Sequence, residues 1–374
     1  MKRTTLALMS ALVLSAAFGQ EAVTLPSKPR SPESGRVLEL REVLRISDAA
    51  GGFFFKNPEN IRPAPDGGVL VVDEGEFLRF DASGRFAVNM FRAGQGPGEL
   101  QQIENYLVLD SQVLAFQRNP MKCVFTDLEG KLLREVKPDA PVTRLLGRCG
   151  DRLLAAGNAV PAIDKVQKPE GESLDIAWTL KLLSEDGRVE ATSLTYPTKM
   201  FAKRLPKALI ADNMTFLLCA PLEDGLVAVA HEEGYVVKIA DPAKDKAVRT
   251  IRRDYRRVRY EPEKPADTAG GARRLAPPRD YHNDIQKLFA VDGRVWVMTS
   301  TVDPGKGVLV DVLSPGGEYL DCFFLPLPKG VSLRGLGRHP LTISGRTMLA
   351  LEALEDGRLE VVKYEIIDPA ARDR

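Results

Sequence analysis

Histidine and cysteine are scarce in this sequence, and neither occurs in a metal-binding pattern. The 374 residues include three histidines and four cysteines. His231, His282 and His339 are widely separated along the chain, which excludes the closely spaced ligand pairs of common zinc sites. No two cysteines have the spacing of a zinc or redox motif. The chain also lacks a Gly-x-Ser-x-Gly elbow and a Gly-x-x-x-x-Gly-Lys phosphate loop, so no common catalytic motif indicates an enzyme.

Charge of one sign is not in excess either. The chain has 52 lysines and arginines against 51 aspartates and glutamates, a formal net charge of +1. We therefore expect no nucleic-acid partner, because such partners attract strongly basic surfaces. One local basic run, residues 252–260, includes two tyrosines and would suit an anionic polymer. Because Glu261 and Glu263 adjoin it, we interpret the run as the solvated face of an outer strand.

Long apolar runs are confined to the N-terminus. Lys2 and Arg3 precede an apolar run from Leu6 to Phe18, and small residues follow it. This pattern predicts a secretory signal peptide over residues 1–19, and the run is too short for a transmembrane helix. Residues 20–35 are rich in proline and serine and predict a mobile leader. We expect an exported monomer, periplasmic or extracellular, with no transmembrane segment.

What the sequence does contain is a series of short strands separated by turns, clearest between Asn60 and Leu100. Asp66-Gly67-Gly68 predicts a tight turn, because glycine accepts a positive φ without steric cost. Val69 to Val72 is an apolar, β-branched run of the kind that forms a buried strand. Further strands are predicted at Phe77–Phe80 and Phe86–Phe91. One such antiparallel meander cannot bury both of its faces, so copies of it must stack.

This stretch resembles the NHL-repeat type of six-bladed β-propeller. The matching features are the turn Asp66-Gly67-Gly68, Val71-Val72-Asp73, Phe80-Asp81 with Ser83-Gly84, and Gly94-Gln95-Gly96-Pro97-Gly98-Glu99. In such proteins the Gly-Pro-Gly-Glu run carries the chain from the outer strand of one blade to the inner strand of the next. The resemblance covers roughly forty residues, and elsewhere only the rhythm of strands and turns is retained.

Five looser copies follow the first. The second strands of the six units are predicted to begin near residues 69, 113, 153, 225, 295 and 347. The first two spacings are typical of four-stranded blades, and the longer ones contain irregular segments. These segments are an insert at 158–173, a linker at 196–213 with a short helical piece near Leu205–Ala211, and a stretch at 262–280.

We therefore predict an all-β fold, a six-bladed β-propeller over residues 36–368 with a disordered tail at 369–374. The strand Arg36–Ile46 has no hairpin partner nearby, and we expect it to complete the last blade, which would remove the exposed edge of an open array. Seven blades are the alternative, if the long spacers contain another meander.

The four cysteines are Cys123, Cys149, Cys219 and Cys322. Export permits disulfides, and four cysteines allow three complete pairings, so the pairing stays open. Three of the four lie in apolar strand patterns, which favours small buried hydrophobic residues. Cys123 with Cys149 is the pair to test first, because they fall in consecutive blades.

Polar residues come just before the inner strand of every predicted blade. In a propeller these positions meet at one mouth of the central channel, and convergent polar groups are what a ligand pocket needs. The alternative is that they are solvated or capping loop residues. His231, by contrast, is interpreted as part of a solvated turn. The candidate ligand-binding residues are Asn60, Glu104, Arg144, Asn213, Tyr281, His282, Asp284 and His339.

The predicted function is a binding module for an exported protein, a peptide or a glycan, without an evident cofactor. One alternative is a metal-dependent hydrolase or lyase. Propellers of the gluconolactonase type hold a divalent cation at this mouth, and that resemblance would make Glu104, Asn213 and Asp284 ligands of Ca²⁺ or Mg²⁺. The other alternative is a structural component of an envelope complex.

Overall fold

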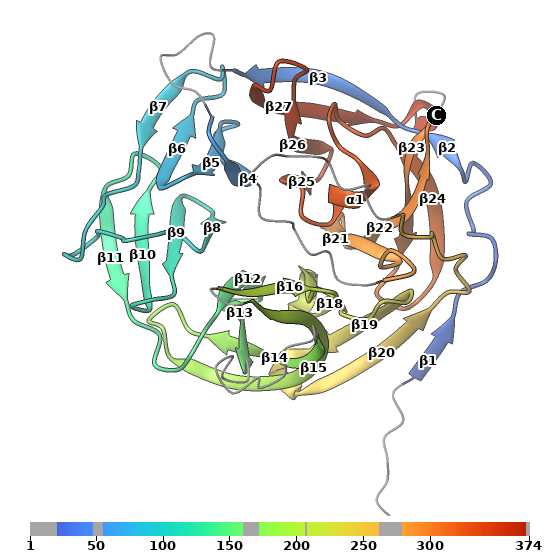
Figure 1. The fold of residues 1–374 in the computed structure, drawn as a ribbon, viewed down its shortest axis with the longest axis horizontal. Coiled ribbons are helices and arrows are strands. Elements are labelled where there is room, and N and C mark those ends of the chain that lie inside the picture. Colours follow the sequence, from blue (N-terminus) through green and yellow to red (C-terminus); the bar gives the residue numbers. More distant parts are fainter. Residues whose placement is uncertain (1–20, 48–54, 160–171, 206–207, 262–278, 372–374) are drawn as a thin grey trace, which may run out of the picture.

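The computed structural model describes residues 21–47, 55–159, 172–205, 208–261 and 279–371. These residues form six separate sheets, arranged as blades around a central axis (Figure 1). Neighbouring strands along the chain pair antiparallel within each blade. The predicted six-bladed β-propeller is therefore confirmed, and the seven-bladed alternative is wrong.

The first three blades follow one another along the chain, and the third has an extra strand. Blade one consists of β4 (Pro58–Pro63), β5 (Val69–Asp73), β6 (Glu76–Phe80) and β7 (Phe86–Asn89). Blade two consists of β8 (Asn105–Leu109), β9 (Gln112–Gln117), β10 (Lys122–Asp127) and β11 (Leu132–Val136). Blade three consists of β12 (Arg144–Cys149), β13 (Arg152–Ala159), β14 (Glu172–Leu183), β15 (Val189–Leu205) and β16 (Ala208–Asn213).

The last three blades each take their outermost strand from the N-terminal part of the chain. Blade four consists of β17 (Leu218–Pro221), β18 (Val227–Ala230), β19 (Val236–Asp241), β20 (Lys246–Arg252) and β1 (Glu21–Thr24). Blade five consists of β21 (Ile285–Val291), β22 (Arg294–Asp303), β23 (Gly307–Leu313), β24 (Tyr319–Leu325) and β2 (Arg36–Val37). Blade six consists of β25 (Leu341–Ser344), β26 (Thr347–Ala353), β27 (Leu359–Ile367) and β3 (Glu39–Ile46).

The ring is closed by β3, as the sequence predicts. β3 pairs antiparallel with β27, and the register places Ile46 opposite Val361. The predicted strand Arg36–Ile46 is nevertheless divided, because Arg36 and Val37 pair with β24 of blade five instead. This division lets one segment cover the outer edges of two blades, whose backbone N–H and C=O groups would otherwise lack partners.

The mobile leader predicted at residues 20–35 is wrong for the residues that the structure describes. β1 pairs in parallel with β20, with Glu21 opposite Arg249. The N–H groups of Arg30 and Ser31 then donate to carbonyls of blade five at 2.9 and 3.0 Å. The open edge of each blade supplies the hydrogen-bond partners that fix a segment whose composition alone indicates a loop.

Parts of the predicted domain scheme lie outside the described residues. The signal peptide predicted at 1–19 lies wholly outside them, as does almost all of the stretch 262–280. At the other end, Pro369–Ala371 forms a short 3₁₀ turn where disorder is predicted. Among the described residues, no helix combines the length and the apolar character needed to cross a membrane.

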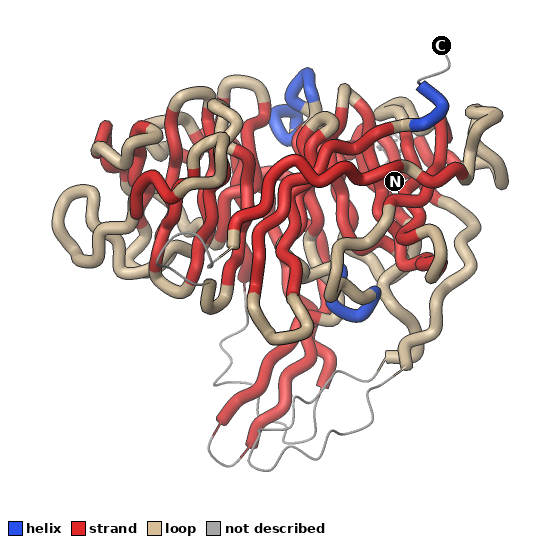
Figure 2. The backbone as a smooth tube through the Cα atoms, turned by 90° about the horizontal axis from the view of Figure 1, so that it is seen from above, coloured by secondary structure: helices blue, strands red, loops and turns tan. Residues whose placement is uncertain are grey.

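Blade three projects beyond one face of the ring, as the long strands in Figure 2 show. β14 and β15 have 12 and 17 residues, and β16 pairs with the distal part of β15. The linker predicted at 196–213, with its helical piece, is therefore wrong. Cross-strand pairing with β14 and β16 overrides the local helical preference of this segment.

The turns quoted for the first blade form as predicted. Gly67 has a φ of +87°, in the left-handed region that favours glycine, and Gly68 N–H donates to Asp66 Oδ1 at 3.1 Å. The run from Gly94 to Glu99 connects β7, the outer strand of blade one, with β8, the inner strand of blade two. The Glu99 carboxylate accepts the N–H of Gly96 at 2.8 Å, which closes this connection into a compact loop.

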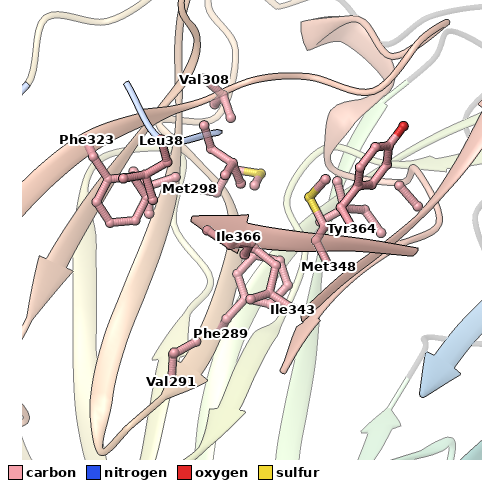
Figure 3. Packing of buried hydrophobic residues seen from close by; sticks show 14 of the residues in the cluster. Leu38, Phe289, Val291, Met298, Val308, Phe323, Ile343, Met348, Tyr364 and Ile366 are labelled. Carbon is pink, nitrogen blue, oxygen red and sulfur yellow. The ribbon is translucent and has the colours of Figure 1, made fainter. Parts of the chain in front are cut away.

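Hydrophobic side chains pack between neighbouring blades, where each sheet buries the face that it cannot bury alone. Figure 3 shows the cluster between blades five and six, to which Leu38 of the N-terminal segment, Phe289 and Ile366 all belong. All four cysteine thiols are free, so the Cys123–Cys149 pair is not formed. Cys123 and Cys149 are buried in these clusters, as expected for small apolar residues.

Candidate functional site

Three of the predicted site residues are gathered around one arginine that the sequence did not single out. Arg257 Nε donates to Asp284 Oδ1 at 3.2 Å, and Arg257 Nη2 donates to the carbonyl of His282 at 3.4 Å. The same guanidinium lies over the ring of Tyr281, 4.8 Å from its centroid. Burial raises the pKa of the Asp284 carboxyl to about 6, although Arg257 acts in the opposite direction.

The contacts of Arg257 also bear on the basic run at 252–260, which the sequence led us to interpret as a solvated strand face. The run leaves blade four after β20, and its side chains turn inward at two points. Arg253 forms an ion pair with the fully buried Asp311, and Arg257 forms one with Asp284. These arginines hold blades four and five together, and they are not a solvated strand face.

Four other predicted residues are engaged separately. Asn60 lies in β4 with a φ of +47°, at an irregularity in the pairing with β5. Glu104 precedes β8 and contacts Arg118 at 3.8 Å. Arg144 begins β12 and donates to the carbonyl of Leu217. His339 Nε2 lies 2.7 Å from the carbonyl oxygen of Leu351, and burial lowers the pKa of its ring.

The eighth residue, Asn213, is not at the start of an inner strand. It ends β16, opposite Met200 of β15, and the inner strand of blade four begins later, at Leu218. The difference arises because the linker before blade four forms strands of blade three. The pocket predicted at the channel mouth from these eight residues stays a prediction.

The carboxylates proposed for a divalent cation are held by arginines. Glu104 contacts Arg118, and Asp284 contacts Arg257. Within the described ranges, no group of three or more histidine, cysteine, aspartate or glutamate residues is placed to hold a metal ion. The divalent-cation alternative stays a prediction.

A cavity of about 610 Å³ lies between blades three and four, and we call it the blade three–four cavity. One wall comes from β14 and β15, at the base of the projecting strands, and the other from the loop between β18 and β19. In an antiparallel meander this loop lies at the end of the blade where the inner strand begins, so the cavity opens on the face of the predicted mouth. Its lining residues are Asp175, Pro197, Thr198, Lys199, Thr215, His231, Glu232, Glu233, Gly234 and Lys238.

His231 makes two polar contacts in this wall. It is buried, with 4% of its surface exposed, so its interpretation as part of a solvated turn is wrong. Nδ1 lies 2.7 Å from the carbonyl oxygen of Pro197, and Nε2 lies 2.7 Å from Lys238 Nζ. Because a carbonyl only accepts and an ammonium only donates, the ring is neutral with its proton on Nδ1.

Lys238 links His231 to a carboxylate at the rim of the cavity. Its ammonium lies 3.1 Å from Glu232 Oε1 as well as 2.7 Å from the imidazole. The ring of Tyr196 packs against His231 in a tilted arrangement, with ring centroids 5.1 Å apart and an interplanar angle of 53°. The His231–Lys238–Glu232 network is therefore fixed in place before any ligand arrives, and it presents a charged, hydrogen-bonding surface.

The network predicts a histidine that resists protonation. Burial and the Lys238 charge lower the pKa of His231 below its ordinary value of 6.5. The folded chain then binds fewer protons at this ring than the unfolded chain, so its contribution to stability is present above pH 6.5 and is lost as the pH falls through the folded-state pKa. We expect an NMR titration of the ring, assigned with His231→Gln, to show this. A midpoint at or above 6.5 would contradict the described network.

Two further hollows of about 510 and 200 Å³ lie side by side on blades five and six. Both are lined by Arg36, whose Nη2 contacts Asp368 at 2.7 Å and Asp321 at 2.9 Å. These ion pairs fasten the N-terminal segment to the two last blades. We assign these hollows a structural role, because their central charges are already paired.

Among the predicted residues whose side chains the structure describes, none lines the blade three–four cavity. Asp175 was missed because it lies just after the segment 158–173 interpreted as an insert, and Lys199 because it lies within the segment 196–213 interpreted as a linker. Lys238 could have been found, since it is a charged residue in the apolar run from Tyr235 to Ile239. A charge at such a position requires a partner or a ligand.

No family model and no curated protein matches the chain. Solved structures match over most of its length. A suspected exported protein of Bacteroides fragilis has 10% identity and a TM-score of 0.49, covering 93% of this chain and 100% of that chain. The PQQ-bound aldose sugar dehydrogenase of Streptomyces coelicolor has 13% identity and a TM-score of 0.44, covering 89% and 99%.

A member of the DUF4221 family from Bacteroides vulgatus has 11% identity and a TM-score of 0.44, covering 89% of this chain and 99% of that chain. Similarity at this level concerns the fold alone, and it carries no argument about activity. The resemblance to NHL repeats accordingly stays a prediction from the first blade.

Proposed function

We propose that this chain is an exported binding protein that holds a small, charged or strongly polar ligand in the blade three–four cavity. The observation that supports this most directly is the His231–Lys238–Glu232 network in the cavity wall. The volume, about 610 Å³, lies in the range of typical small-molecule sites. Export is supported by the signal peptide predicted at residues 1–19.

The proposal makes Lys238 the residue to test. We expect a thermal-shift screen with amino acids, carboxylic acids, sugars and nucleosides to give at least one ligand that raises the melting temperature of the wild-type protein. Lys238→Met should abolish that shift, because it removes the ammonium that holds His231 and Glu232 in the cavity wall. Lys306→Met is the matched control, because Lys306 is a half-exposed lysine on blade five.

Two results would contradict the proposal. One is a screen in which no compound of any class shifts the wild-type protein. The other is a ligand whose effect is the same in Lys238→Met as in the wild type, because that ligand would bind elsewhere.

A further inference from the structure

Two opposite charges face the blade three–four cavity without a partner. Asp175 on β14 and Lys199 on β15 are directly opposite each other in the strand register, and both line the cavity. Both residues are exposed. Opposite charges at such positions usually pair across the strands. In the part of the chain that the structure describes, neither side chain makes an ion pair or a hydrogen bond.

The other charged side chains that line the cavity already have partners. Lys238 is held by Glu232 at 3.1 Å and by His231. Glu233 contacts Arg257 at 3.8 Å. The cavity therefore offers one free carboxylate and one free ammonium. A ligand with one charge of each sign would contact both side chains, whereas a ligand with only one charge would contact one of them.

The position of Lys199 is fixed by the backbone around it. Its N–H donates to Thr215 Oγ1 at 2.8 Å, and its carbonyl accepts the N–H of Met214 at 2.8 Å. The connection into blade four thus holds this part of β15, which fixes the backbone positions from which the Asp175 and Lys199 side chains extend. A backbone that is already held loses less conformational entropy when a ligand binds.

The cavity is poorly suited to rings that bind by stacking. None of its described lining residues is a phenylalanine, tyrosine or tryptophan. Tyr196 is the nearest aromatic ring on β15, but it is 3% exposed and its face is covered by His231. Sugars and nucleobases are commonly held on exposed aromatic faces. Charge complementarity is therefore the property of this cavity that selects a ligand.

We infer that the ligand is a small zwitterion of the amino-acid type, with its ammonium group on Asp175 and its carboxylate on Lys199. This inference rests on the proposed function, since it names the class of ligand for the same cavity. Thr215 is committed to the backbone of Lys199, so the two charged side chains supply the selectivity.

The inference can be tested by calorimetry with three matched probes: L-glutamine, its Nα-acetyl derivative and its α-amide. We expect L-glutamine to bind at least about tenfold more tightly than either derivative, because each derivative lacks one charged contact. Asp175→Asn should weaken L-glutamine and the α-amide by about tenfold but leave the acetyl derivative unchanged. Lys199→Gln should weaken L-glutamine and the acetyl derivative by about tenfold but leave the α-amide unchanged.

The control is the exposed pair Asp303 and Lys306 on blade five, whose charged atoms are 3.8 Å apart. Asp303→Asn and Lys306→Gln should leave all three affinities unchanged. Equal binding of the three probes, or no binding of L-glutamine at millimolar concentration, would overturn the zwitterion inference. The proposed function has a separate test. It fails if no compound in the thermal-shift screen loses its effect in Lys238→Met.

Discussion

Replacing Asp311 by alanine is expected to lower the free energy of unfolding by about 3–5 kcal/mol. Asp311 is fully buried in β23. Its carboxylate accepts the hydroxyl of Tyr235 at 2.8 Å and that of Tyr319 at 2.6 Å, and it forms an ion pair with Arg253. Alanine would leave a mostly buried guanidinium and two buried hydroxyls without their acceptor, and such groups are costly to bury.

The effect should also separate blade four from blade five. Tyr235 and Arg253 belong to the blade four part of the chain, whereas Tyr319 belongs to blade five. Chemical denaturation monitored by tyrosine absorbance measures the loss. Asp303→Ala is the control, because its side chain is 39% exposed and exposed ion pairs contribute at most about 1 kcal/mol. Equal losses in the two variants would show that Asp311 does not join the blades.

Arg45→Ala is expected to weaken the closure of the ring by about 3 kcal/mol. Arg45 lies on β3, and its Nη1 contacts Glu352 at 2.9 Å and Glu360 at 2.5 Å in blade six. The two glutamate side chains are 2% and 8% exposed. Without Arg45 they would be buried carboxylates lacking a counter-charge. We expect a loss at the low end of the range for a broken buried ion pair, because the Arg45 side chain is itself 28% exposed.

A matched control for Arg45 lies on the same strand. Arg41 also contacts a glutamate of β27, Glu365, but its side chain is 63% exposed, so Arg41→Ala should cost less than about 1 kcal/mol. Urea denaturation of the two variants gives the comparison. If Arg41→Ala proved as destabilising as Arg45→Ala, the closure would depend on charge at the edge and not on the buried glutamates.

The fold was predictable because its strands are marked by local chemistry. The second strands of the six blades begin at Val69, Gln112, Arg152, Val227, Arg294 and Thr347, each within two residues of the predicted position. Glycine and aspartate turns define these starts, since few other residues accept the backbone conformations required. The closure by β3 was predictable for a different reason, because the last blade has only three strands of its own and needs a fourth from elsewhere in the chain.

The errors came where a distant partner decides the conformation. Residues 196–213 form strands because β14 and β16 pair with β15, and no local pattern reveals that pairing. Residues 21–35 lie against blades four and five for the same reason. The prediction of the candidate site omitted two cavity residues for the same reason. Asp175 and Lys199 could not be placed opposite each other without the register of β14 and β15.

The strands β1, β2 and β3 are the first of the ring to be synthesised and the last to find their partners. Glu21 lies opposite Arg249, Arg36 opposite Phe323, and Ile46 opposite Val361. Pairing over such long sequence separations slows folding. Until β27 has been synthesised, β3 has no partner in blade six and the ring cannot close.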